Sequence, residues 1–275
     1  MNEKLKKDFE EFISRSDINE NDVQEYLEKN TELIPKKFME NHGISENIII
    51  SKLPIGLKYI TDFAFVSKCT IYWNIVLIEI EDPKKKMFTQ ADDFSADFTQ
   101  AKGQIDNWKS LLNYDSNAKE SLECSLKTLI VPERMRDNPI NIKYVLVYGR
   151  SSEINNDIRK KKFAQLNDSS DVAVVTYDSL KNRWENTKLG NCMIANIVSG
   201  DKLSLKIVPD ENFDTGIFSE IHPTKLEINN AQKNIFKKYG YQIDEWEKGY
   251  MLYVNCRLSE ATGAMGNVLG KRKFD

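Results

Sequence analysis

The segment TIYWNIVLIEI, residues 70 to 80, is the most apolar run of the chain. It is rich in β-branched and aromatic residues, and Asp82-Pro83 follows as a break. A continuous apolar run of this length, rather than an alternating one, is typical of a strand that is buried on both faces. The segment therefore predicts the central strand of a sheet that has further layers packed on each side.

Strand and helix patterns alternate on both sides of this segment. Strand-like composition is found at 47–53, 58–66, 143–148 and 172–176, and helical periodicity is found at 93–113 and 154–166. A further helix should begin near Asp178 or Ser179. The order of strands and helices predicts a mixed α/β sheet with helices on its faces.

The two ends of the chain predict smaller helical parts. A helix is expected at 3–14 and a second from Asn21 or Asp22 to a stop before Pro35. Beyond residue 200 a strand at 203–208 precedes helices at 224–238 and 242–258. We therefore expect a helical lead over 1–46, a core over 47–200 and a strand-plus-helices extension over 201–275, which covers the core or forms an oligomer interface.

Composition excludes several classes of protein. The formal net charge is −3, which argues against binding nucleic acid by overall charge, although a local basic surface remains compatible with it. The N-terminal sequence has no apolar core of a signal peptide, and no apolar run is long enough to span a bilayer. A cytoplasmic protein without a membrane partner is expected.

The cysteines and histidines do not form a recognisable metal-binding or disulfide pattern. No two cysteines are spaced as Cys-x-x-Cys, and each histidine is isolated in the sequence. A zinc site and a disulfide framework are therefore not expected, and reduced thiols fit a reducing cytoplasm. These residues are Cys69, Cys124, Cys192, Cys256, His42 and His222.

Three acidic residues are the strongest candidates for chemistry. Asp62 lies within the apolar segment YITDFAF, and Glu79 and Glu81 end the central strand. A carboxylate in a buried strand is costly unless it is paired or binds a metal ion. Side chains alternate along a strand, so Glu79 and Glu81 share a face, and a hairpin would bring Asp62 beside Glu79. Oxygen ligands of this kind suit Mg²⁺.

This pattern resembles the PD-(D/E)xK nucleases, which have the restriction-endonuclease fold. An aspartate in one strand and an acidic-x-Lys end on the next are the marks of that superfamily, and Asp62 and Glu79-Ile80-Glu81 occupy these places. Gln104, with Trp108 four residues later, resembles the Gln-x-x-x-Tyr motif that some branches carry on the following helix. Taken alone, Gln104 would more often be solvated and Trp108 more often a core residue.

Six segments together resemble the Shedu family of bacterial antiphage defence nucleases, over about residues 20 to 185. They occur in the family's order: QEYLEKNTEL, TDFAF, LIEIEDP, FTQAKGQIDNW, VLVYGR and VAVVTYDSL. The resemblance implies a restriction-endonuclease-like fold, DNA as the partner and a role in phage defence. It also implies Mg²⁺ (or Mn²⁺) as cofactor, with a homo-oligomer, dimer or tetramer, and a phage-derived trigger as further expectations.

One position departs from the superfamily pattern, because Glu81 stands where the motif has lysine. Glutamate cannot stabilise an anion, but it can accept a proton or ligate a metal ion. Two lysines on the following helix, Lys102 and Lys109, lie away from the stripe of Gln104 and are poor substitutes. The basic run of residues 84 to 86 could fold back to the strand end, or could hold phosphates.

The resemblance assigns a role to each candidate residue. Asp62, Glu79 and the backbone carbonyl of Ile80 are expected to hold Mg²⁺, while Glu81 activates water or binds a second ion. Gln104 is expected to orient a water on the ion or a backbone phosphate. Contacts to nucleic acid are expected from the basic residues Lys84, Lys85, Lys86 and Arg150, although a charged run is more often a solvated face.

Other readings of the same residues stay open. Carboxylates at strand ends can be solvated or paired with lysines, and acidic residues of the second helix (Glu25, Glu28, Glu32) could be extra ligands or surface residues. A metal-dependent DNA endonuclease is the main hypothesis. The alternatives are a non-catalytic module that binds nucleic acid or a phage protein, and a purely structural interaction protein, which would need the acidic strand residues paired with Lys or Arg.

Overall fold

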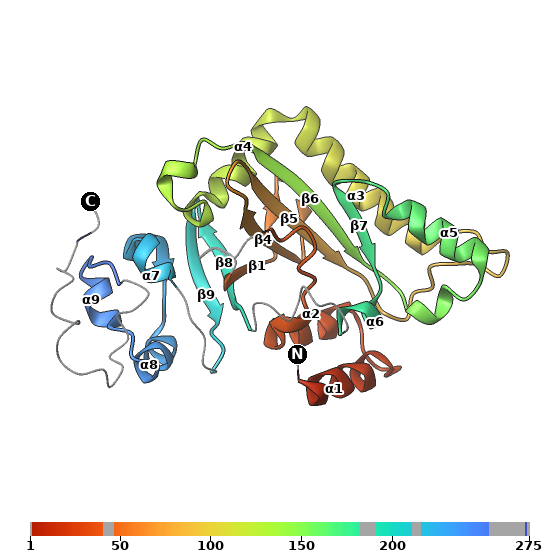
Figure 1. Cartoon of the computed structure of the whole chain (residues 1–275), viewed down its shortest axis with the longest axis horizontal. Coiled ribbons are helices and arrows are strands. Elements are labelled where there is room, and N and C mark those ends of the chain that lie inside the picture. The colour runs from red at the N-terminus through yellow and green to blue at the C-terminus, as the bar shows by residue number, and fades with distance from the viewer. Residues whose placement is uncertain (1, 41–46, 182–190, 211–215, 253–272, 274–275) are drawn as a thin grey trace.

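A computed structural model of the chain describes residues 2–40, 47–181, 191–210, 216–252 and 273. Within these residues an eight-stranded sheet has the order β10-β9-β8-β1-β4-β5-β6-β7 (Figure 1). Its strands are β1 (Ile48–Ser51), β4 (Phe63–Lys68), β5 (Trp73–Ile80), β6 (Ile140–Val147), β7 (Val172–Val175), β8 (Met193–Ser199), β9 (Lys202–Ile207) and β10 (Leu226–Glu227).

Strand directions make this a mixed sheet, as the sequence predicts. β4 pairs antiparallel with both β1 and β5, whereas β5, β6 and β7 run parallel to one another. All eight residues of β5 are buried, in agreement with a central strand covered on both faces. A separate small hairpin is formed by β2 (Pro54–Ile55) and β3 (Tyr59–Ile60).

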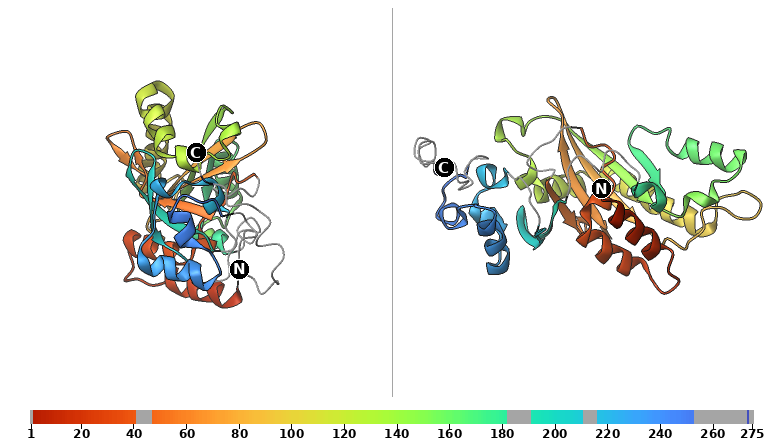
Figure 2. Two further views of the ribbon diagram at one scale, coloured as in Figure 1. Left: turned by 90° about the vertical axis from the view of Figure 1, so that its left-hand side faces the viewer. Right: turned by 60° about the horizontal axis from the view of Figure 1, so that its bottom comes forward.

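Helices cover both faces of the sheet, and alternate residues of β5 face each layer. Ile75 and Leu77 pack in the cluster that contains α3 (Ala96–Tyr114) and α4 (Ser116–Ser125). Val76 and Ile78 pack in a second cluster with α1 (Glu3–Ile13) and α2 (Glu20–Lys29). Figure 2 shows α1 and α2 side by side. The predicted α/β architecture with N-terminal helices is therefore confirmed.

Asn19 determines where α2 begins. Its side chain accepts hydrogen bonds from the backbone N–H groups of Asn21 and Asp22, and the Asp22 carboxylate accepts one from the Asn19 N–H in return. This reciprocal arrangement is a capping box, which satisfies N–H groups that the first helical turn leaves unpaired. The helix starts one or two residues earlier than expected, so that Glu20 is its first residue.

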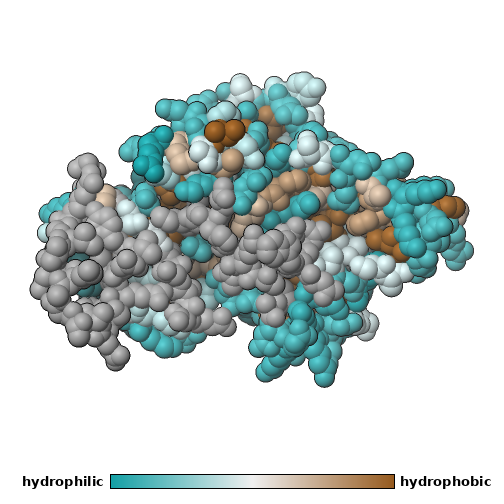
Figure 3. Space-filling view, in the orientation of Figure 1, coloured by the Kyte–Doolittle hydropathy of each residue, from teal (hydrophilic) through white to brown (hydrophobic). Residues whose placement is uncertain are grey.

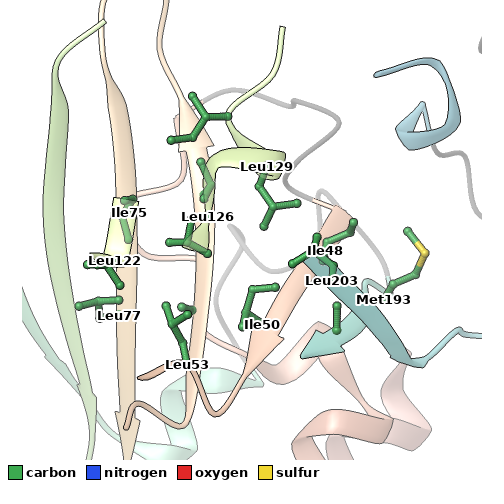
Figure 4. Close-up of a cluster of buried hydrophobic side chains, with 14 of the residues drawn as sticks. Ile48, Ile50, Leu53, Ile75, Leu77, Leu122, Leu126, Leu129, Met193 and Leu203 are labelled. Carbon is green, nitrogen blue, oxygen red and sulfur yellow. The ribbon is translucent and has the colours of Figure 1, made fainter. Parts of the chain in front are cut away.

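The sheet continues beyond residue 200 without interruption. β8 and β9 form an antiparallel pair, and Ile48 and Ile50 of β1 lie near Met193 and Leu203 in the hydrophobic cluster of Figure 4. The core and the extension thus share one sheet, and their division at residue 200 stays a prediction.

Among the residues described beyond β9 are the short α-helices α7 (Ile217–Glu220), α8 (Asn230–Lys238) and α9 (Ile243–Glu247). Phe218 packs edge to face on Phe236 and lies near Trp246, with ring centroids 4.8 and 5.1 Å away. Figure 1 shows these helices beyond β9, at the end of the molecule opposite α5 (Asp157–Leu166). The last part of the helix predicted at 242–258, from residue 253 onward, lies outside the described residues.

The face shown in Figure 3 is hydrophilic along much of its edge, and apolar residues are spread between its middle and its right-hand side. Among the described residues no helix has both the length and the apolar character needed to cross a membrane.

Candidate functional site

The register of two strand pairs brings Asp62 and Glu79 together. Phe63 pairs with Ile78, so the preceding Asp62 lies opposite Glu79, and the Asp62 N–H donates to the main-chain oxygen of Ile78 over 3.1 Å. Alternation along the strands directs both carboxyl groups to the face covered by α3. Asp62 is 4% exposed and Glu79 8% exposed. The structure therefore places two carboxyl groups side by side under a helix.

Asp62 is held by one backbone group and one lysine. Its Oδ2 accepts a hydrogen bond from the N–H of Ile80 over 2.7 Å, and its Oδ1 lies 2.5 Å from Nζ of Lys52. Lys52 follows directly after β1, and the register Ile50 to Ala64 and Ser51 to Phe63 continues to Lys52 opposite Asp62. A lysine from a third strand thus reaches the site, and the sequence analysis did not predict it.

Glu79 has one satisfied oxygen and one unsatisfied oxygen. Its Oε1 accepts a hydrogen bond from Nε2 of Gln104 over 2.5 Å, whereas its Oε2 is buried and accepts no hydrogen bond. Burial, followed by the negative charge of Asp62 and a side-chain hydrogen bond with Asp62, raises the pKa of Glu79 to about 10, and the charges of Glu20 and Glu81 add to this effect. A cation placed between Asp62 and Glu79 would relieve both the burial cost and the repulsion.

Glu81 lies at the more exposed end of the site. Its carboxylate lies 2.5 Å from Nζ of Lys85, so one lysine of the basic run does fold back to the strand end. The Tyr177 hydroxyl donates to the main-chain oxygen of Glu81. Burial first, and then nearby acidic groups, raise the pKa of Tyr177 well above its usual value, which keeps this hydroxyl a donor. The contact fixes the strand end against α6 (Tyr177–Leu180).

The second helix contributes a carboxylate that the sequence analysis did not name. Burial and the charges of Asp62 and Glu81 raise the pKa of Glu20, while Lys52 and Lys85 lower it. The Asn19 cap was the signal that could have identified this position. Of the three residues that were considered instead, Glu25 is exposed and lies 3.9 Å from Lys29, and Glu32 belongs to a short 3₁₀ helix.

Glu28, the third of them, belongs to a buried network on the opposite face of the sheet. Its Oε1 accepts hydrogen bonds from Ser51 over 2.6 Å and from Lys206 over 2.8 Å. Gln24 lies between this network and the site, because its Nε2 is 3.3 Å from both the Ser51 hydroxyl and the main-chain oxygen of Asp62. Glu28 therefore supports the strands beneath the site rather than facing Glu79.

The basic residues Lys84 and Lys86 differ in how far contacts inside the protein engage their side chains. Lys84 donates to the main-chain oxygens of Ser16 and Ile18, over 3.2 and 2.6 Å, and so ties the loop after β5 to the α1–α2 connection. Lys86 is exposed. Lys84 would have to leave internal partners to contact nucleic acid, whereas Lys86 would not.

Arg150 is also engaged inside the fold. Its guanidinium forms a fork with both oxygens of Asp178, at 2.9 to 3.1 Å, and donates to the main-chain oxygen of Ile13 over 3.2 Å. This ion pair lowers the pKa of Asp178 against the opposing effect of burial. Lys102 and Lys109 pair with Asp106 and Asp171, so neither replaces the motif lysine.

The site suits a divalent cation in its donor chemistry but not in its present side-chain positions. Its donors are oxygens, and Glu79 has a buried oxygen that accepts no hydrogen bond, as expected where a hard cation binds. Within the described ranges, however, no three acidic, histidine or cysteine side chains converge as ligands. Asp62 and Glu81 each have a lysine at 2.5 Å, so a bound cation would have to displace ammonium groups.

Comparison with known proteins identifies the family. The family model described as "Shedu protein SduA, C-terminal" matches residues 17–180, which is more than half of the chain. The chain belongs to the Shedu family. Membership implies a role in antiphage defence and agrees with the resemblance seen in the sequence. A search of curated proteins gives no match.

Proposed function

We propose that this Shedu protein is a Mg²⁺- or Mn²⁺-dependent endonuclease that cleaves DNA phosphodiester bonds in bacterial antiphage defence. The observation that supports this most is the buried pair of Asp62 and Glu79, one oxygen of which accepts no hydrogen bond. Two adjacent buried carboxyl groups, of which Glu79 has a pKa raised to about 10, are costly in a purely structural role. A binding site for a divalent cation explains why this cost persists.

The proposed roles follow from the contacts of each residue. Asp62, Glu79 and the Ile80 carbonyl would hold the ion, which when bound would stabilise charge on the phosphoryl oxygens and lower the pKa of water. Gln104 keeps the Glu79 carboxylate in position through its 2.5 Å hydrogen bond. Glu81 is half-buried and accessible enough to accept a proton from water.

A second candidate function is supported by a specific observation. Lys52 and Lys85 already neutralise Asp62 and Glu81, as expected if the site no longer binds a cation and the fold only binds nucleic acid or a phage protein. The purely structural reading requires all three acidic residues to be paired in this way. Glu79 does not fit that reading, because its Oε1 accepts from an uncharged amide and its neighbour Asp62 is a second acidic group rather than a lysine or arginine.

Cleavage of linear and circular DNA by the purified protein, with Mg²⁺ or Mn²⁺, tests the proposal beside folded Asp62→Ala and Glu81→Ala variants. The wild type should cut, and neither variant should. If only Asp62→Ala loses activity, the metal site stands and the role of Glu81 is wrong. If the wild type cuts nothing with either cation, alone or with phage lysate as a source of trigger, the binding-module function is favoured.

A further inference from the structure

We propose that Lys52 supplies the positive charge that the motif lysine would have supplied, delivered from the end of β1 instead of the end of β5. This inference rests on the proposed nuclease function. In detail, the Lys52 ammonium group pairs with Asp62 when no cation is bound and moves to a non-bridging oxygen of the scissile phosphate when cation and DNA enter.

The position of Lys52 is set by the backbone on both sides. Its N–H donates to the main-chain oxygen of Asp62 over 2.9 Å, and the N–H of Thr61 donates to the main-chain oxygen of Leu53 over 2.9 Å. These bonds continue the β1–β4 ladder to the level of the site. By alternation the side chain of Lys52 leaves the sheet on the same face as that of Asp62. The fold therefore fixes the backbone of Lys52 next to the carboxyl groups of Asp62 and Glu79.

The conformation of Lys52 also points to a use for its side chain. Its φ is +53°, in the left-handed region that glycine and asparagine adopt more readily than lysine. A lysine at a position where its backbone is strained is more readily explained by a use for its ammonium group than by local folding.

The side chain of Lys52 can reach both proposed partners. It is 47% exposed, whereas Asp62, which it contacts, is almost fully buried. A cation bound to Asp62 would repel the ammonium group, and a long flexible side chain can move outward to an incoming phosphate at little cost. Lys85 is the alternative source of charge, but it pairs with Glu81 at the outer end of the site rather than with Asp62.

Asparagine is the informative replacement, because it removes the charge yet tolerates φ near +53°. Lys52→Asn leaves the buried Asp62 carboxylate without its lysine, so it should melt at a lower temperature than wild type in EDTA and should keep its stabilisation by Mn²⁺. Its single-turnover DNA cleavage should fall by about 100- to 1,000-fold, as when one group that stabilises transition-state charge is removed. Lys52→Arg should recover part of the rate, and Lys119→Gln, an exposed-helix control on α4, should behave as wild type.

A second readout does not depend on cleavage. With Ca²⁺ in place of Mg²⁺, the affinity of Lys52→Asn for a DNA duplex should fall, and the slope of log affinity against log salt should decrease by about 1. Lys85→Gln, measured in parallel, should lose less cleavage than Lys52→Asn.

Several results would overturn the inference. It fails if Lys52→Asn cleaves within about threefold of wild type, if Lys85→Gln has the larger effect, or if Lys52→Asn loses its response to Mn²⁺ as Asp62→Asn should. If wild type cuts no DNA, the nuclease proposal fails, but this result does not test the contact between Lys52 and phosphate. The affinity for a DNA duplex then tests that contact. A loss of affinity in Lys52→Asn supports the phosphate contact, and unchanged affinity overturns it.

Discussion

Two buried glutamates lie on opposite faces of the sheet, Glu28 on helix α2 and Glu79 on strand β5. Their electrostatic surroundings are opposite. Glu28 is 3% exposed, and although burial would raise its pKa, hydrogen bonds from Lys206 and Ser51 outweigh this effect and lower it. Glu79 is 8% exposed and has an amide partner and carboxylate neighbours, which together with burial raise its pKa to about 10. Burial alone therefore does not distinguish a structural carboxylate from one that awaits a cation.

The difference lies in whether the fold itself provides compensating groups. Around Glu28 the protein supplies a lysine, a hydroxyl and an amide, so the charge is satisfied when the chain folds. Around Glu79 it supplies one amide and leaves Oε2 without a hydrogen-bond donor. We infer that Glu28 contributes to stability, whereas Glu79 reduces stability until a cation is bound.

Replacing each glutamate by glutamine should produce the largest contrast in activity. Glu79→Gln removes a proposed cation ligand and should reduce DNA cleavage by about 1,000-fold or more. Glu28→Gln should keep cleavage within about tenfold of wild type, because its carboxylate does not face the cation. Single-turnover rates at saturating Mg²⁺ measure both, and equal losses in the two variants would remove the distinction.

Gln104→Ala should have the next largest effect. It removes the hydrogen bond that orients Glu79, and loss of such a supporting partner typically costs about 10- to 100-fold in metal affinity or activity. The expected change is a higher concentration of Mn²⁺ for half-maximal cleavage. A matched replacement on the same helix, Lys102→Ala, should leave this concentration unchanged, and a similar shift in both variants would point to a general disturbance of α3.

The two glutamine replacements should affect stability in the opposite way from activity, with the larger loss of stability in Glu28→Gln. Glu28→Gln should lower the free energy of unfolding by about 1 to 3 kcal/mol, because hydrogen bonds to a charged group are lost in a buried network. Glu79→Gln should leave it unchanged or raise it in the absence of divalent cations, since glutamine removes the cost of protonating a buried carboxyl group when the chain folds at neutral pH. Urea unfolding monitored by circular dichroism compares the two, and a destabilised Glu79→Gln protein would show that Glu79 is structural.

The pH dependence of stability should also separate the two residues. Glu79 binds a proton more tightly in the folded state, so its contribution is present below its ordinary pKa of 4.5 and is lost as the pH rises toward 10. The lowered pKa of Glu28 gives a contribution that is present above its ordinary value and is lost in acid. Melting temperatures in EDTA should show a decline above about pH 5 that Glu79→Gln abolishes. A decline that persists in that variant would contradict the assignment.

Much of this arrangement was predictable from local patterns. The apolar run at 70–80 predicted β5, an expected hairpin predicted that Asp62 would lie beside Glu79, and the resemblance to a Gln-x-x-x-Tyr motif on the following helix singled out Gln104. These predictions hold because strand pairing and helix periodicity are local properties of the sequence. The candidate roles of these residues stay predictions.

What the sequence did not reveal depends on contacts between distant segments. Lys52 reaches Asp62 only because β1 pairs with β4, and an exposed lysine after a short strand carries no signal of its own. β8 was not predicted, since its seven residues are buried at one end and exposed at the other, and it pairs with β1 about 145 residues away in sequence. The lysine partner of Glu28 likewise comes from β9.

The stabilising effect of Mn²⁺ on wild type, Glu79→Gln and Glu28→Gln tests most directly whether Asp62 and Glu79 form a cation site. A ligand that binds only the folded state raises the melting temperature, by an amount that grows with the logarithm of its concentration once that exceeds the Kd. The account predicts that Mn²⁺ raises the melting temperature of wild type and of Glu28→Gln, the latter from a lower starting value, and does not raise that of Glu79→Gln. Equal shifts in all three proteins, or no shift in wild type at millimolar Mn²⁺, would contradict it.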